Sequence, residues 1–188
     1  MEKGIYKYSP TLQFEIGRLG SAFVNLCTQS PSLYIDLPLY ESQSIGGLNL
    51  HCYVLDTGST YEAFTFNCTF KFSYDVSLTV SSSTELCINN PSGSKHKYQL
   101  NTTNNRYESL EDKSYIVSLY NEETCLTTYT LFDESENENV FLGNGTTLYL
   151  NTIKLKNGKE ITITRDTSNR VLQIDNPLSN ERIKFDCI

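Results

Sequence analysis

Residues 152–164, TIKLKNGKEITIT, decide the fold of this chain. Apolar and polar side chains alternate on both sides of the Asn157-Gly158 pair, which places every second residue on the same face of an extended strand. Asn-Gly between two alternating segments is a strong hairpin signal, because both residues tolerate the positive φ angles of a type I′ turn. The stretch therefore predicts an antiparallel β-hairpin.

The same alternation recurs along the chain in short runs bounded by Gly, Asn, Asp, Ser or Pro, a pattern typical of strands. The predicted strands are residues 32–39, 48–55, 74–80, 97–100, 115–119, 125–132, 147–155, 160–164 and 170–174. Residues 10–26 are the best helix candidate, although two Gly and a mixed pattern weaken it. We expect an all-β fold of consecutive antiparallel hairpins, with a β-sandwich or a jelly roll as the alternative architecture.

The composition agrees with a single folded β unit. The 188 residues allow one domain or at most two small ones, and the 13 Tyr and 9 Phe favour the half-buried surface of a sheet. The net charge of −7 argues against nucleic acid or an anionic membrane as a partner, because both need a basic surface. Charged residues interrupt the first twenty positions and no long apolar run follows, so we expect neither a signal peptide nor membrane insertion.

The cysteines do not have the spacing of a metal site. They are Cys27, Cys52, Cys68, Cys87, Cys125 and Cys187. None belongs to a C-x-x-C pair and only two His are present, so we expect no metal. We favour isolated thiols, while the even count also permits three disulfides. The acidic run 133–139 is interpreted as a solvated loop, because the Gly and the spaced carboxylates of a calcium loop are missing.

The chain offers few candidates for catalysis. Asp56-Thr57-Gly58 matches an aspartic-protease loop, but that chemistry needs two adjacent carboxylates and the motif occurs once, so only a homodimer could supply the pair. The alternative is a turn between two strands. His51 and Cys52 are neighbours in a predicted strand and should point to opposite faces, and His96 is placed in an exposed turn. No Gly-rich phosphate loop is present, so we expect no enzyme, no catalytic residue and no cofactor.

Tyrosines recur in the predicted strands and have two interpretations. They are Tyr98, Tyr107, Tyr115, Tyr120, Tyr129 and Tyr149. Aromatic cross-strand packing is the first interpretation, because such pairs stabilise sheets. A platform for a sugar or a protein is the second, because Tyr combines a flat apolar face with a polar tip.

The last part of the chain has a 20-residue period, from Asp166 to Asp186. Residues 165–186 resemble one repeat of the Rhs, or YD-repeat, family. Asp166 stands at the Asp position and Asn169 at the Gly position, where Asn is acceptable in a left-handed turn, while Arg165 replaces the expected Tyr. Upstream, residues 23–29, 33–39, 46–50 and 72–78 resemble the segment that opens the shell in this family, except that Thr69-Phe70 replaces a Gly-Trp.

The resemblance implies a structural, non-catalytic protein that is secreted or at the cell surface. In this family, strands wind into a hollow shell around a toxin or another effector. The resemblance divides this single all-β unit into a lead-in at 1–20, a shell-opening segment at 21–145 and YD-like hairpins at 146–188. The expected partner is the remainder of a larger β-shell, or another copy, through an exposed strand edge.

The rival hypothesis is a stand-alone β-sandwich that binds a carbohydrate or a protein, or a structural protein of a virus or phage. Topology separates the two hypotheses, because sequential hairpins favour the shell and Greek-key crossings favour the sandwich. The dimeric aspartic protease built on Asp56 is the third hypothesis.

Overall fold

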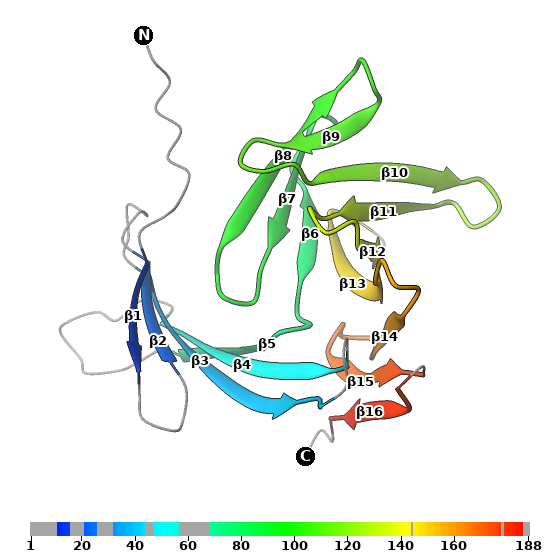
Figure 1. The fold of residues 1–188 in the computed structure, drawn as a ribbon. Helices are drawn as coiled ribbons and strands as arrows, with labels where there is room; N and C mark the ends of the chain where they lie inside the picture. The colour runs from blue at the N-terminus through cyan, green and yellow to red at the C-terminus, as the bar shows by residue number, and fades with distance from the viewer. Residues whose placement is uncertain are drawn as a thin grey trace, which may run out of the picture.

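The structure, a computed structural model, describes residues 11–15, 21–25, 32–43, 47–56, 68–143, 145–177 and 179–185. The protein is all-β, and its strand pairs are antiparallel (Figure 1). The first sheet has five strands in chain order: β1 (Thr11–Glu15), β2 (Ser21–Asn25), β3 (Ser32–Glu41), β4 (Asn49–Asp56) and β5 (Cys68–Phe72). Among the described residues, no helix is long and apolar enough to cross a membrane.

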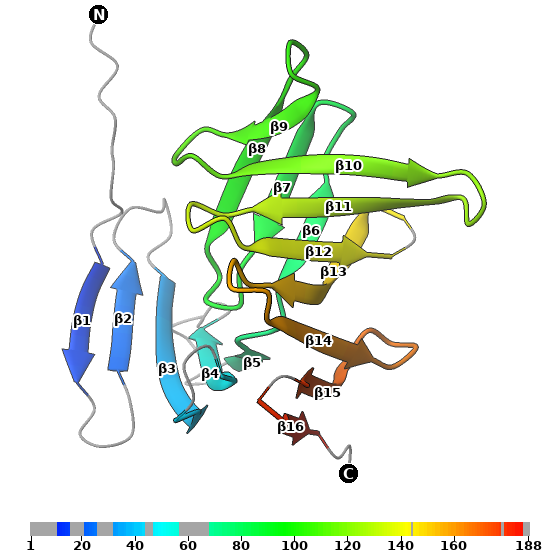
Figure 2. The same ribbon diagram turned by 45° about the vertical axis from the view of Figure 1, so that its right-hand side comes forward.

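The second sheet has eleven strands, and eight of them close into a barrel. The barrel strands are β6 (Ser77–Val80), β7 (Glu85–Asn89), β8 (Lys95–Asn101), β9 (Arg106–Ser109), β10 (Tyr115–Asn121), β11 (Leu126–Phe132), β12 (Glu138–Leu142) and β13 (Thr147–Lys154). Each pairs with the next along the chain, and β13 closes the ring by pairing with β6. Figure 2 shows β10, β11 and β12 crossing one side of this barrel.

A continuous ring of apolar side chains explains why the barrel closes. Paired positions around the ring are Leu78 with Ile88, Leu86 with Tyr98, Leu100 with Tyr107, Tyr107 with Ile116, Ile116 with Leu131, Tyr129 with Phe141, Phe141 with Leu150 and Leu148 with Leu78. These residues belong to one buried or partly buried apolar cluster. An eight-stranded barrel has an interior just wide enough for side chains to fill, so burial of this ring stabilises the closed form.

Beyond the barrel, the sheet continues from the C-terminal end of β13. Residues 147–149 of that strand pair with β6, whereas 152–154 pair with β14 (Glu160–Arg165). Two further strands, β15 (Val171–Asn176) and β16 (Glu181–Lys184), continue the ladder in chain order. Ile161, Ile163 and Ile174 extend the barrel core into this ladder.

Each run predicted as a strand contains one, although β6 covers only residues 77–80 of the run 74–80. The predicted helix is wrong: residues 10–26 contain β1 and β2, because the two Gly fall between segments that pair as strands. The sequence analysis did not foresee the β13–β6 closure. The resemblance divides the chain at position 145. The barrel contains strands from both segments, since β6 to β12 precede that position and β13 follows it.

The 152–164 hairpin is confirmed, but its turn is not of type I′. Gly158 has a φ of 81°, whereas Asn157 is not among the described residues with positive φ. The Leu155 N–H donates to the Lys159 carbonyl at 2.7 Å, and the Gly158 N–H donates to the Leu155 carbonyl at 2.8 Å. This is a type I turn followed by one left-handed residue, the usual form of a three-residue hairpin loop.

Candidate functional site

A carboxylate in β16 joins the two sheets. Glu181 accepts hydrogen bonds from the Ser42 hydroxyl, from the Leu48 N–H at 3.0 Å, from the Ser179 hydroxyl at 2.8 Å and from the Tyr40 hydroxyl at 3.3 Å. Tyr40 lies in β3, and Leu48 immediately precedes β4. We call this group of five residues the Glu181 clasp, because it ties the end of the first sheet to the last strand of the second.

The clasp fixes the charge of Glu181. The hydrogen bonds, led by that of Ser42, hold the pKa of the Glu181 carboxyl at about 2, against an ordinary value of 4.5. A carboxylate with so low a pKa is a poor general base at neutral pH. Gly47 leaves the room for it, since a Cβ there would contact Ser42 and lie 2.8 Å from Glu181 Oε2. The Glu181 clasp therefore connects β16 to the ends of β3 and β4 and is not suited to acid–base catalysis.

A buried arginine makes the second connection. Arg165, at the end of β14, has a side chain that is only 10% exposed. Its guanidinium donates to the carbonyls of Tyr74 at 2.8 Å, Leu150 at 3.2 Å and Asn169 at 2.9 Å, and Nη1 lies 3.4 Å from Asp75 Oδ1. The fixed fork of donors on Arg suits such a junction. Arg165 thereby locks the emerging hairpin onto β13 and the segment before β6.

His51 and Asp36 form the only His–carboxylate pair within the first sheet among the described side chains. His51 Nδ1 lies 2.8 Å from Asp36 Oδ1, and the imidazole stacks on Tyr53. Cys52 is buried, and the register places it opposite Leu37, whereas Asp36 lies opposite Tyr53. The alternation therefore keeps the Cys52 thiol on the other face from the imidazole, as the sequence predicted. Burial, with a contribution from Asp36, raises the pKa of that thiol and makes it a weak nucleophile.

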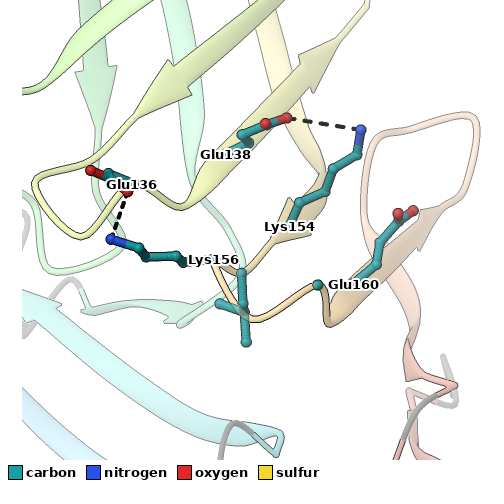
Figure 3. Close-up of a pocket in the computed structure, with 7 residues that line it drawn as sticks. Glu136, Glu138, Lys154, Lys156 and Glu160 are labelled. Atoms are coloured by element: carbon teal, nitrogen blue, oxygen red, sulfur yellow. Dashed lines mark ion pairs between the residues drawn. The ribbon is translucent and has the colours of Figure 1, made fainter.

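A charged groove of about 330 Å³ lies beside the hairpin that opened the sequence analysis. Its lining residues are Glu136, Glu138, Lys154, Leu155, Lys156, Gly158 and Glu160. Figure 3 shows two ion pairs, Lys156 to Glu136 at 2.6 Å and Lys154 to Glu138 at 3.9 Å. Charges of both signs in an open, solvated groove give it no clear preference for a charged ligand.

Other predicted residues fall into separate places. Asp56 ends β4 opposite Cys68 of β5, and Thr57 to Thr60 lie outside the described residues. His96 lies in β8 instead of a turn, 3.4 Å from Glu111. Among the described residues, no three His, Cys, Asp or Glu side chains gather in a group that could hold a metal.

The tyrosines and cysteines also have defined surroundings. Tyr98 and Tyr107 are buried, Tyr115 stacks on Phe132 and Tyr120 is exposed, so packing accounts for most of this set. The thiols that the structure describes are free, as favoured from the sequence: Cys52, Cys87 and Cys125. Cys27, Cys187 and the side chain of Cys68 lie outside the described part of the structure.

Sequence reasoning missed both the Glu181 clasp and the Arg165 connection. Arg165 stood out only as a departure from the YD pattern, and Glu181 had no distinguishing neighbour in the sequence. The partners of Glu181 are up to 141 residues away, so no local signal could have identified them.

No protein-family model matches this chain, and no curated protein or solved structure matches it either.

Proposed function

We propose that this chain is a non-catalytic structural β-unit, of the kind implied by its resemblance to the Rhs/YD-repeat family. In that role it contributes strands to a shell around a toxin or another effector, or to a contact at the cell surface, and it is secreted or surface-exposed. The observation that carries the proposal is the strand order. Within each of the two sheets, and apart from the β13–β6 closure, the described strands pair with their neighbours in the chain, which suits a wound shell better than a Greek-key sandwich.

The turn after β14 supports the same proposal. Asn169, at the position of the repeat's Gly, has a φ of 64°. The Asp166 carboxylate accepts from the Ser168 N–H and the Arg170 N–H, both at 2.9 Å, and from Arg170 Nε at 2.7 Å. A left-handed residue and a turn-closing Asp give physical roles to two positions of the repeat pattern.

The open edge of β16 indicates where further structure would join. β16 pairs with β15 along one edge, and no described strand pairs with its other edge. Arg182 and Lys184 are exposed on this strand. Charged side chains at an edge discourage unspecific pairing while leaving the backbone available to a defined neighbour.

Cross-linking mass spectrometry tests this proposal on protein purified natively from the cells that make it. Lys184 at the β16 edge should form cross-links to lysines outside residues 1–188, or to a second copy. Lys113, exposed in the loop between β9 and β10, is the matched control and should give links within the chain. Only internal links from both lysines, together with the mass of a single chain, would contradict the proposal.

A further inference from the structure

The edge of β16 presents a defined set of open backbone groups. The N–H of Phe185, directly after β16, donates to the Leu172 carbonyl at 2.9 Å, so the backbone of Phe185 faces β15. The backbone groups of successive residues point to opposite sides of a strand. Those of Arg182 and Lys184 therefore face the edge that no described strand covers (Figure 2). A neighbouring strand would form its hydrogen bonds opposite these two residues.

Lys184 lacks a carboxylate partner on its own face of the sheet. Asp175 of β15 lies opposite Arg182, and both of its oxygens are engaged. Oδ1 accepts from Arg182 Nε and Oδ2 accepts from the Gln173 amide, each at 2.5 Å. Lys184 is exposed, and its amino group makes no ion pair with any residue that the structure describes. The edge therefore carries a cation whose charge β15 does not balance.

The other face of β16 ends a row of apolar side chains. Ile163, Ile174 and Ile183 lie opposite one another on β14, β15 and β16. The first two are fully buried, whereas Ile183 is only partly buried. Side chains of a strand alternate between its faces, so Ile183 lies on the face away from Lys184. An apolar side chain of the next strand, opposite Ile183, would extend the row and remove more apolar surface from water.

A second β16 does not fit this edge. Two β16 strands paired antiparallel about Ile183 would place Arg182 of each copy opposite Lys184 of the other. Pairing centred on Arg182 or on Lys184 would place that residue opposite its own counterpart. Directly opposed like charges destabilise a strand pair, whereas opposite charges stabilise it. Charge complementarity therefore favours a strand with a carboxylate at this position.

We propose that the β16 edge binds an antiparallel strand from outside residues 1–188 that carries a carboxylate opposite Lys184 and an apolar residue opposite Ile183. These two positions are consecutive in the partner strand, because its side chains also alternate between faces. The antiparallel direction continues that of the described strand pairs. The inference rests on the proposed function and narrows it, since it specifies the chemistry of the strand that joins β16.

Zero-length cross-linking with a carbodiimide tests this proposal on protein purified natively from the cells that make it. The reagent joins an amine directly to a carboxylate in contact with it. Lys184 should become linked to an Asp or Glu outside residues 1–188 that has an apolar neighbour in sequence. Lys113 is the matched control, because its N–H donates to Glu134 at 3.4 Å and its links should stay within the chain.

Two outcomes of the carbodiimide experiment would overturn the proposal. One is a link from Lys184 only to Asp175 or to another carboxylate of residues 1–188. The other is no carboxylate link from Lys184 where amine-reactive cross-linking has detected an external neighbour. In that second case the proposed function stands and the acidic partner does not, so the two proposals fail separately.

Charge reversal at Lys184 gives a second readout on the purified full chain. K184E places a carboxylate opposite Arg182 of a second β16, so this variant should have a dimer dissociation constant at least about tenfold lower than that of the wild type. K184Q should have a smaller effect, and K113E, in an exposed loop, should have none. Sedimentation equilibrium measures all four chains. Equal self-association of the wild type and K184E, including none for either, would overturn the role of charge at this edge.

Discussion

At the scale of single residues, four of the hairpin turns share the same left-handed position. Gly93, Glu136, Gly158 and Asn169 have φ angles of 87°, 63°, 81° and 64°. In each case the N–H of this residue donates to the carbonyl three positions earlier. The repeated geometry indicates that a residue able to adopt positive φ is important at these four reversals.

Substitution of Gly158 should show how much stability is lost when a residue with a side chain adopts this positive φ angle. Gly158→Ala should lower the free energy of unfolding by about 1 kcal/mol, because an L side chain is strained at positive φ while the space around Gly158 is open. Gly158→Asn is the control and should cost less, since Asn tolerates this region. Urea unfolding measures both, and equal losses for Ala and Asn would contradict the explanation.

The low pKa of Glu181 predicts that the folded protein loses stability in acid as this carboxylate is protonated. Its pKa is about 2 in the folded protein and ordinarily 4.5, so the folded state favours the charged carboxylate. The stabilisation from this group is fully present above pH 4.5 and is lost as the pH falls towards 2. Glu181→Gln should flatten the decline of stability between these values, measured by thermal unfolding across pH. Glu134→Gln, at an exposed turn, should leave the decline unchanged.

At the scale of elements, one side chain connects β14 to the barrel and to the segment before β6. Arg165 donates to backbone carbonyls of β13, of the segment before β6 and of the turn after β14. The guanidinium also lies 5.3 Å from the centre of the Tyr149 ring. Burial lowers the pKa of Arg165 while Asp75 opposes that shift, and the group stays charged.

Removal of the Arg165 guanidinium should destabilise the folded protein. Arg165→Met should lower the free energy of unfolding by about 2–4 kcal/mol, since it removes the ion-pair partner of Asp75 and a donor to the carbonyls of the buried residues Tyr74 and Leu150. Arg165→Lys should recover part of the loss by keeping the charge without the fork of donors. Arg182→Met is the control, because this 59% exposed arginine should contribute at most about 1 kcal/mol through its pair with Asp175. Equal effects of R165M and R182M in guanidinium unfolding would refute this role.

At the scale of the whole molecule, barrel closure produces the main core. Phe141 of β12 is fully buried and pairs with Tyr129 on one side and Leu150 on the other. These contacts connect the strands next to the point where β13 returns to β6. The side chains at the closure therefore belong to the same cluster as those of the emerging hairpins.

Replacing the large side chain of Phe141 next to the barrel closure should destabilise the whole barrel. Phe141→Ala should cost about 3–5 kcal/mol, because a large side chain is removed from a closely packed core. Leu142→Ala, at the next residue and 38% exposed, should cost far less. Hydrogen exchange should show loss of protection in β6 as well as β12 for the first variant. Loss confined to β12 would show that the ring does not unfold as a unit.

The sequence by itself determined nine of the sixteen described strands and the hairpin turn at Asn157-Gly158, since these depend on alternation and on residues a few positions apart. Alternation shows which residues share a face but not which distant strand lies beside them. The return of β13 to β6, the 91-residue separation between Arg165 and Tyr74, and the 139-residue separation between Glu181 and Ser42 were decided only by tertiary structure. Burial of a common apolar ring selected those long-range partners, and no local pattern records that selection.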